Sequence, residues 1–580
     1  MKRFKTFVAI LGIMGMTVSL GTACGSKQAQ PTGGSDTTAT KPAADGAKEE
    51  ANADAPKEIK EFSFYIAMPG TEIPDDNRMY NKIAEKIGAK AKVTWLTGQT
   101  TKESIGTMIA GGDYTDFIVG NEGTSLLVKA GALIPIDEYW DDYPNIKNYL
   151  SESQWNRCRD ADGHIYLIPE FGIINDKDVA CYYNDEAFWI QIRVLEWAGW
   201  PEIKTVDEYF KVISDYLKAN PTMDNGLENI GFELLCDDWR YYSLENPPMF
   251  LAGYPNDGCC IVDKETLTAI NYNTTDIAKR YFNIINEQYK AGILDPECFT
   301  LNYDQFIAKL STGRVCGMVE QYWDFLTAEQ SLVTQGLDDC VYVPLPLVLD
   351  ESTTPNWHAQ PAFDTSNGIS ITTSCKDIPG ALQMINDLLD VENQTMIYWG
   401  EEGVDYQKDE NGLFSRNDEQ RANFLDKDWL TKNMADGVYS YFPHYEGMSL
   451  DGINAYKPEF QPSEYYDAQP EARKKVLDAY GKKTFMEFMD PADEENDPWY
   501  PMWSYTNTWT ADTEYGIQKV YMDEVKHEYL PKIIMADDYE SAWQDYMKVL
   551  NDRVDMKCYE DALTAEVQRR VDVANGKTAN

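Results

Sequence analysis

The chain has very little histidine, and it lacks the short motifs that mark many hydrolytic and nucleotide-using enzymes. Its 580 residues include four histidines, at His164, His358, His444 and His527, and none lies in an H-E-x-x-H motif or at zinc-ligand spacing from a cysteine. No G-x-S-x-G motif, phosphate-binding loop or dinucleotide-binding fingerprint occurs. The sequence therefore predicts no catalytic centre of these kinds, no metal site and no cofactor.

Basic residues are also scarce relative to acidic ones. Lysine and arginine total 51 against 96 aspartates and glutamates, so the formal net charge is -45. A surface this acidic repels nucleic acids and anionic membranes, so neither is expected as a direct partner. The overall charge does not describe the binding site, because a local basic pocket can lie in an acidic protein.

Cysteine spacing indicates neither a disulfide framework nor a redox motif. Eleven cysteines are scattered along the chain without any C-x-x-C, and only Cys259 and Cys260 are adjacent. Dense disulfide pairing is typical of small secreted scaffolds, whereas a chain of this length builds its own core. We predict that most of the ten cysteines after Cys24 are buried free thiols.

The N-terminus carries an apolar run that is too short to span a bilayer comfortably. Three basic residues precede the run over 7–20, and small residues and then Cys24 follow it. This order resembles a bacterial lipobox, although Gly21 stands where a leucine is usual. We predict a signal peptide over 1–23 and lipid attachment at Cys24. An ordinary cleaved signal with a coincidental cysteine is the alternative.

The segment that follows Cys24 has almost nothing to bury. Residues 25–58 are small, polar or charged and include no aromatic side chain, so this segment cannot offset the entropy of ordering. We predict a disordered tether over 24–58. Together with the lipid, it would hold the protein at the outer face of the cell membrane, since nothing else in the chain resembles a membrane span.

Beyond the tether, strand and helix patterns alternate. Strands are predicted over 61–68, 91–96 and 116–120, and helices over 76–88, 102–111, 539–550 and 559–573. Thr205 and Glu208 form a predicted capping box, followed by apolar residues at helical spacing. This alternation predicts an α/β fold with mostly parallel sheets.

Seven sequence blocks occur in a fixed order along the chain. They are AGGDYTDFIVG (110–120), ALIPIDEYWDDYPNIKNYL (132–150), DGHIYLIP (162–169), YYNDEAF and VLEWAGWPEIKTVDEYFKVI (within 182–213), YKAGILDPECFT (289–300), FIAKLSTGRVCGMVEQYWD (306–324) and YWGEEGVDY (398–406). In this order they resemble the extracellular solute-binding proteins of family 1, and in particular their large lipoprotein branch in Gram-positive bacteria. The similarity runs from about Phe62 to the C-terminus.

The resemblance implies two α/β lobes joined at a hinge, with a central ligand cleft, as in class II periplasmic binding proteins. Mapping the blocks assigns 59–170 and 345–395 to the first lobe, and 171–344 and 396–580 to the second. Within this scheme, 368–389 is the strand and helix with which the chain returns to the first lobe. Ligands of open α/β sheets bind beyond the carboxyl ends of strands, so the loops there are the candidate site.

Sugars present apolar C–H faces, which flat aromatic rings cover, and a rim of hydroxyls, which polar side chains satisfy. Residues of these types lie mostly near predicted strand ends and in the long C-terminal loops. The candidate ligand-binding residues are Trp95, Asp113, Asp116, Trp239, Arg240, Tyr322, Trp323, Trp357, Glu402, Trp503 and Trp509. Burial in a core is the alternative for each tryptophan, and a structural role for Glu402. Arg240 would bind an acidic sugar or pair with Asp237 or Asp238.

Together these features predict the substrate-binding lipoprotein of an ABC importer, a monomer without enzymatic activity. It would capture a carbohydrate, with an oligosaccharide favoured, and deliver it to permease and ATPase subunits. A secreted carbohydrate-active enzyme is one alternative, since paired carboxylates cannot be judged without geometry. A peptide-binding protein of similar shape is the other.

Overall fold

The computed structural model describes residues 59–577 except 161, 171–172, 176–177, 358–362, 366 and 490–495. The predicted signal peptide, Cys24 and the tether lie outside the described residues. Within the described part, we find no helix that combines the length and apolarity of a membrane span. From Lys57 onward the chain forms one compact unit, which contains two main β-sheets, each with its own large apolar core.

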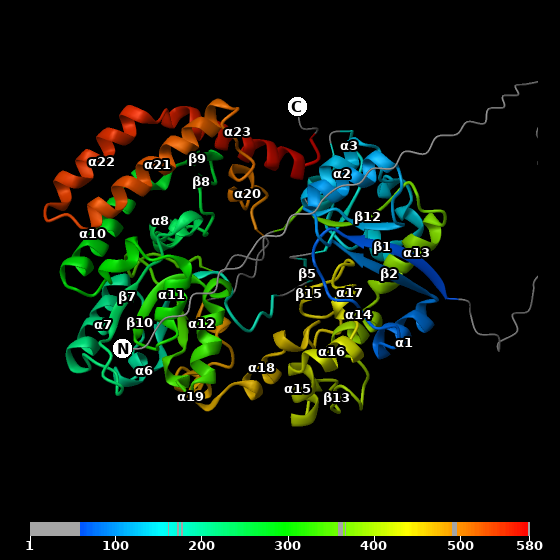
Figure 1. Ribbon diagram of the computed structural model, residues 1–580, viewed down its shortest axis with the longest axis horizontal. Helices are drawn as coiled ribbons and strands as arrows, with labels where there is room; N and C mark the ends of the chain where they lie inside the picture. Colours follow the sequence, from blue (N-terminus) through cyan, green and yellow to red (C-terminus); the bar gives the residue numbers. More distant parts are fainter. Residues whose placement is uncertain are drawn as a thin grey trace, which may run out of the picture. The chain divides into compact units, whose positions relative to one another are not determined.

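The first sheet is built from β1 (Lys60–Ile66), β2 (Ala89–Trp95), β3 (Phe117–Val119), β4 (Ile168–Pro169) and β12 (Gly368–Ile371). Their order across the sheet is β2–β1–β3–β12–β4. Figure 1 labels three of these strands, β1, β2 and β12. β1 pairs in parallel with β2 and β3, whereas β12 is antiparallel to both β3 and β4. The three predicted strands at the start of the chain are therefore confirmed.

The helices that connect these strands begin and end at residues suited to capping. α1 (Arg78–Ile87) starts after Asn77, whose side chain accepts a backbone hydrogen bond, and ends at Gly88, whose φ of 75° is easily adopted by glycine. α2 (Thr101–Gly111) starts with a capping box. Other first-lobe helices are α3 (Thr124–Lys129), α4 (Pro144–Lys147), α5 (Glu152–Arg157), α13 (Ile378–Leu388), α14 (Val391–Tyr398), α15 (Asp418–Leu425), α16 (Lys427–Asn433) and α17 (Asp436–Tyr439).

The second sheet contains β6 (Glu186–Gln191), β7 (Ile230–Glu233), β10 (Val315–Gln321) and β11 (Tyr342–Leu345), in the order β11–β6–β10–β7. β10 is parallel to β7, whereas β6 is antiparallel to β10 and β11. The predicted capped helix is confirmed as α7 (Val206–Ala219), with the capping box between Thr205 and Glu208. Its buried side chains join the core of this sheet.

Across the two sheets, three strand pairs are parallel and four are antiparallel, so the prediction of mostly parallel sheets is wrong. One strand in each sheet causes the difference, β12 in the first and β6 in the second. Each is the first strand of its sheet that the chain forms after arriving from the other core. Such a strand starts at the edge where its parallel neighbours end, and it therefore runs in the opposite direction.

C-terminal helices complete the second core. α21 (Glu514–Ile534), α22 (Tyr539–Arg553) and α23 (Met556–Ala574) bury apolar side chains there, and α21 and α22 pack beside α10 (Asp276–Lys290) (Figure 1). The two predicted C-terminal helices are thus confirmed as α22 and α23. Further second-lobe elements are α6 (Ile192–Trp197), α8 (Tyr242–Glu245), α9 (Pro247–Leu251), β8 (Ile261–Asp263), β9 (Thr268–Ile270), α11 (Tyr303–Leu310), α12 (Tyr322–Thr334), α19 (Glu471–Ala479) and α20 (Trp503–Thr506).

Two segments pack in a different lobe from the one predicted. The first core draws on residues between 62 and 173 and between 363 and 442, and the second on residues between 183 and 357 and between 476 and 567. Residues 345–357 therefore belong to the second lobe and 396–442 to the first, where Phe442 lies 5.2 Å from Phe64 between ring centroids. Helical spacing predicts that a segment is buried, but it does not specify against which core.

The chain passes between the cores after Ile173, after Trp357 and after Phe442. Two of these passages are joined by a short parallel pair, β5 (Ile174–Asn175) with β15 (Glu446–Gly447). Strands that pair while crossing between lobes are suited to act as a hinge, because a few residues there absorb the change in direction.

An ion pair between Arg78 and Asp405 ties α1 to the segment reassigned to the first lobe. Arg78 Nη2 lies 2.7 Å from Asp405 Oδ1, and the Asp405 carboxylate is buried. We expect Asp405→Ala to lower the free energy of unfolding by about 2 kcal/mol, because Arg78 loses its buried partner. Urea unfolding measures the loss. Glu402→Ala removes an exposed carboxylate from the same turn and should change stability by less than about 0.5 kcal/mol. Equal losses of stability in the two variants would contradict the assignment of residues 396–442 to the first lobe.

Candidate ligand-binding site

The carboxyl ends of the parallel strands in the first sheet face the passages between the lobes. In β12, Ile369 lies opposite Val119 at the end of β3, so the residues before β12 lie beyond the carboxyl end of β3. Pro169 lies opposite Gly368 at the end of β4, so Glu170 follows at the same edge. This is the edge at which open α/β sheets bind ligands.

The second sheet presents a matching edge. Glu186, the first residue of β6, lies opposite Gln321, the last residue of β10. Glu186 Oε2 accepts a hydrogen bond from Asn256 Nδ2 at 3.0 Å, and the neighbouring Asp257 accepts the backbone N–H groups of Met502 and Trp503. These contacts anchor the start of α20 close to the edge where β10 ends.

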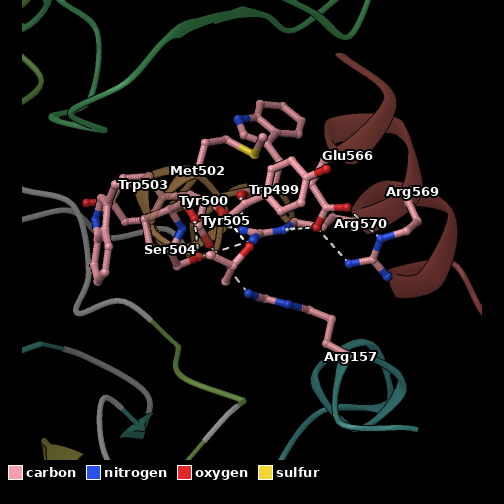
Figure 2. Close-up of polar contacts among 12 residues, drawn as sticks. Arg157, Trp499, Tyr500, Met502, Trp503, Ser504, Tyr505, Glu566, Arg569 and Arg570 are labelled. Carbon is pink, nitrogen blue, oxygen red and sulfur yellow. Dashed lines mark hydrogen bonds and ion pairs between the residues drawn. The ribbon is translucent and has the colours of Figure 1, made fainter. Parts of the chain in front are cut away.

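A pocket of about 520 Å³ brings residues of both lobes together (Figure 2). The first lobe contributes the end of α5 and the residues that precede β12, and the second contributes α20 and α23. The lining residues are Arg157, Phe363, Asp364, Thr365, Pro501, Trp503, Ser504, Tyr505, Asn507, Thr508, Arg569, Arg570 and Val573. A pocket of this size, with rings and hydrogen-bonding groups, is suited to a small polar ligand.

Arg570 organises the floor of this pocket. Its Nη1 donates to the carbonyl oxygens of Trp499 at 2.8 Å and Pro501 at 2.7 Å, and its Nη2 donates to Ser504 Oγ at 3.1 Å. These bonds fix the chain that leads into α20, and so they fix the direction in which Trp503 and its neighbours point.

Glu566 holds both arginines of α23. Its carboxylate accepts from Arg569 Nε at 2.6 Å and from Arg570 Nε at 2.8 Å (Figure 2). Burial alone would raise the pKa of Glu566, but the hydrogen bonds from these two arginines lower it, so the group stays ionised. With two arginines on one carboxylate, this wall is positively charged although the whole protein is acidic.

Arg157 joins the pocket from the first lobe. Its guanidinium lies 4.9 Å from the ring centroid of Phe363, and its Nη2 donates to the carbonyl oxygen of Tyr500 at 3.4 Å. The same side chain therefore contacts the passage into β12 and the loop before α20. A ligand in the pocket would meet both lobes here.

Glu170 is a further polar group at the first-sheet edge. Its side chain is fully buried, and neither carboxylate oxygen has a hydrogen-bond partner within the described part of the chain. Burial, with a smaller contribution from nearby Asp364, raises the pKa of Glu170 well above its usual value. A buried acid without a partner at this edge is a candidate hydrogen-bonding group for a ligand.

Among the residues predicted from sequence, Trp503 lines the pocket, and its side chain is 42% exposed. Trp323 is 44% exposed and is the second residue after β10, where its Nε1 donates to Gln321 Oε1. Tyr322 beside it packs on the second core and donates to Glu329. Arg240 forms a bidentate ion pair with Asp324, a partner that the sequence did not suggest.

Other predicted residues have structural surroundings. Trp357 is 2% exposed in the second core, and its Nε1 donates to the carbonyl oxygen of Leu347, so its predicted role at a ligand surface is wrong. Trp95 ends β2 and packs against Tyr441, and Trp509 packs against the second core. The side chain of Trp239 lies outside the described part.

The predicted acidic residues lie away from the pocket. Asp113 and Asp116 precede β3 and so lie at its amino end, which is the opposite edge from the pocket. Asp116 Oδ2 accepts from the backbone N–H of Ser63 at 2.8 Å, a contact that fixes β1. Glu402 is exposed in the turn that contacts α1. This geometry argues against a binding role for Asp113 and Asp116.

Sequence reasoning missed several residues of the pocket. Arg157, Arg569 and Arg570 lie on helices, where no motif or strand end marks them. Glu170, which lies at the edge of the first sheet and does not line the pocket, directly follows the DGHIYLIP block (162–169), and the sequence analysis did not single it out.

Buried thiols lie directly behind α20. All ten cysteines after Cys24 are free, and eight are buried, as predicted. Within the described residues, Asp257, Cys259 and Cys260 lie close enough together to hold a metal ion. The Asp257 carboxylate, however, already accepts the backbone N–H groups at the start of α20. We therefore assign this cluster a role in holding α20.

No protein-family profile matches the chain, and no curated protein matches its sequence. Solved structures do match. An extracellular solute-binding protein from Bifidobacterium longum subsp. infantis has a TM-score of 0.60 at 13% identity, over 89% of this chain and 98% of that chain. An HMO-binding, ABC-transporter-associated solute-binding protein from Bifidobacterium longum infantis has a TM-score of 0.58 at 14% identity, over 89% and 99%.

A third match is the S. pneumoniae ABC-transporter substrate-binding protein FusA, an EF-hand mutant in complex with fructo-nystose. Its TM-score is 0.56 at 17% identity, over 88% of this chain and 99% of that chain. The chain thus has the two-lobed α/β fold of solute-binding proteins, as predicted. This fold agrees with the resemblance to extracellular solute-binding family 1.

Proposed function

We propose that this protein is the substrate-binding component of an ABC importer and that it captures a carbohydrate, most suitably an oligosaccharide. The observation that carries the proposal is the pocket at the strand ends, where Trp503 and Tyr505 stand among hydroxyl, amide and arginine side chains of both lobes. Proteins of similar fold support the carbohydrate class, since one binds HMO and another is in complex with fructo-nystose.

The proposed mechanism is capture followed by closure. A ligand that contacts Arg157 on one lobe and α20 on the other favours the closed arrangement, because it makes both sets of contacts only there. The closed form is then recognised by permease subunits, and no covalent step is involved. Lipid attachment at Cys24 would keep this monomer at the outer face of the membrane, near its permease.

A thermal-shift screen of residues 25–580 tests the proposal. A ligand at ten times its Kd adds about 1.4 kcal/mol to the free energy of unfolding, which raises the melting temperature. We expect one family of oligosaccharides to give such a shift and a panel of short peptides to give none. A shift with peptides alone would overturn the carbohydrate assignment. Release of product from a glycan would instead support the enzyme alternative.

A further inference from the structure

A second pocket, of about 530 Å³, lies apart from the candidate ligand-binding pocket and shares no lining residue with it. It is formed by the end of α14, by α15, α16 and α17, by the short turn at Pro458–Phe460 and by α18 (Pro462–Ala468). Its volume is within the range of small-molecule sites. We call it the α15–α18 pocket.

The basic side chains of the α15–α18 pocket are already engaged. Arg416 Nε lies 3.4 Å and Arg421 Nη2 3.1 Å from the carboxylate of Glu464, which is almost completely buried. Lys457 Nζ lies 2.7 Å from Glu446 Oε1. Each of these basic groups therefore already has an acidic partner, Glu464 from the pocket wall or Glu446 from outside it.

Two carboxylates of the pocket are in a different position. Asp436 and Glu459 line it, and within the described residues neither has a basic group within ion-pair distance. Both residues are exposed, but the protein packed around their carboxylates raises the pKa of each. Backbone N–H groups and Lys457 oppose this rise at both, and Arg416 also opposes it at Glu459. Their mutual repulsion also raises the pKa of Glu459.

Tyr398 supplies an independent observation. It lines the pocket at 7% exposure, and its buried hydroxyl has no hydrogen-bond partner within the described residues. Its ring also lies 5.3 Å from Lys457 Nζ. A buried hydroxyl without a partner is costly, so a ligand that supplied one would be favoured. Phe424 and Leu430 provide an apolar wall beside it.

We propose that the α15–α18 pocket binds a small organic amine, with its ammonium group held by Asp436 and Glu459. Lys457 acts on these carboxylates without forming an ion pair with either, whereas an ammonium group in the pocket would donate charge-assisted hydrogen bonds to them, which are stronger than neutral ones. The hydroxyl of Tyr398 gains a partner, and the carbon chain packs on Phe424 and Leu430. This site is independent of carbohydrate binding in the other pocket.

Titration calorimetry of residues 25–580 with 1,4-diaminobutane at constant ionic strength tests this proposal. We expect saturable binding of the diamine and none of 1,4-butanediol, which has the same chain without charge. The double variant Asp436→Asn, Glu459→Gln is expected to weaken binding at least tenfold. The matched double variant Asp428→Asn, Glu419→Gln removes two exposed carboxylates outside the pocket and should bind as tightly as the wild type.

The melting temperature of each ligand-free variant reports whether it folds. If the double variant does not fold, binding is measured with the single variants Asp436→Asn and Glu459→Gln instead. No saturable binding of the diamine would overturn the proposal, as would equal binding by the pocket variants or the diol. Loss of diamine binding in Trp503→Ala would place the amine in the candidate ligand-binding pocket instead. Failure of the glycan screen leaves this test unaffected, because the two pockets are separate.

Discussion

Glu186→Gln is expected to make the protein more stable at pH 8 while leaving it nearly unchanged at pH 5. Glu186 is fully buried at the start of β6, where Asn246 and Asn256 donate to Oε2 and Oε1 has no partner within the described residues. Burial raises the pKa of Glu186 to about 8, and the two amide hydrogen bonds only partly oppose this.

The sign of the effect follows from proton binding. Between the unfolded pKa, near 4.5, and the folded value near 8, the folded state holds a proton that the unfolded state has lost. The contribution of the Glu186 side chain to the free energy of unfolding is therefore present at pH 5 and falls as the pH rises, by about 1.4 kcal/mol per pH unit. Glutamine resembles the protonated acid and does not titrate. The difference between variant and wild type should grow by roughly 4 kcal/mol from pH 5 to pH 8.

Urea unfolding of both proteins at pH 5, 6, 7 and 8 measures this difference directly, because other titrating groups contribute equally to each. Glu265→Gln is a matched control, since it removes an exposed carboxylate from the turn between β8 and β9. The control should run parallel to the wild type at every pH. A Glu186→Gln profile that also runs parallel would show that this carboxylate is ionised in the folded protein.

Local structure followed closely from local sequence. The alternation of apolar residues in β1, the capping box before α7 and the return of the chain in β12 and α13 (Ile378–Leu388) were all predictable. Each depends on interactions within a few residues, such as a side chain that accepts a hydrogen bond from the next turn.

Features that depend on distant residues were not predictable. The segment 396–442 has buried helical faces, but only contacts with α1, such as that of Arg78 with Asp405, decide which core covers them. The directions of β6 and β12 depend on the path between the lobes. Trp357 lies in a loop, which suggested a ligand surface, yet a carbonyl oxygen and a ring 4.0 Å away, that of Phe250, place it in the core.

The same reasoning explains what the sequence did and did not indicate about the pocket. Trp503 belongs to a conspicuous aromatic cluster, so the sequence singled it out as a candidate. Arg569 and Arg570 look like ordinary surface residues of a helix, and only the fold brings them to α20. The strand-end rule pointed to the edge of the first sheet beside this pocket, while side chains from α20 and α23 supply most of its lining.

Trp503→Ala is expected to weaken binding of the glycan selected by the thermal-shift screen by about 100-fold, or about 2.7 kcal/mol. An exposed indole in a pocket covers the apolar face of a sugar ring, and large aromatic residues at the centre of a site often carry this much of the binding energy. Because the ring is 42% exposed, its removal should leave the melting temperature of the ligand-free protein nearly unchanged.

Trp197→Ala is the matched control, because Trp197 is 45% exposed on α6 and does not line the pocket. Titration calorimetry should give the wild-type Kd for this variant. Trp323→Ala separates the two parts of the site, since Trp323 follows β10 rather than lying on α20. Loss of affinity in both Trp503→Ala and Trp323→Ala would mean that the glycan extends from α20 to the end of β10. A normal Kd in Trp503→Ala with a large loss in Trp323→Ala would move the site to the strand end and exclude the α20 pocket.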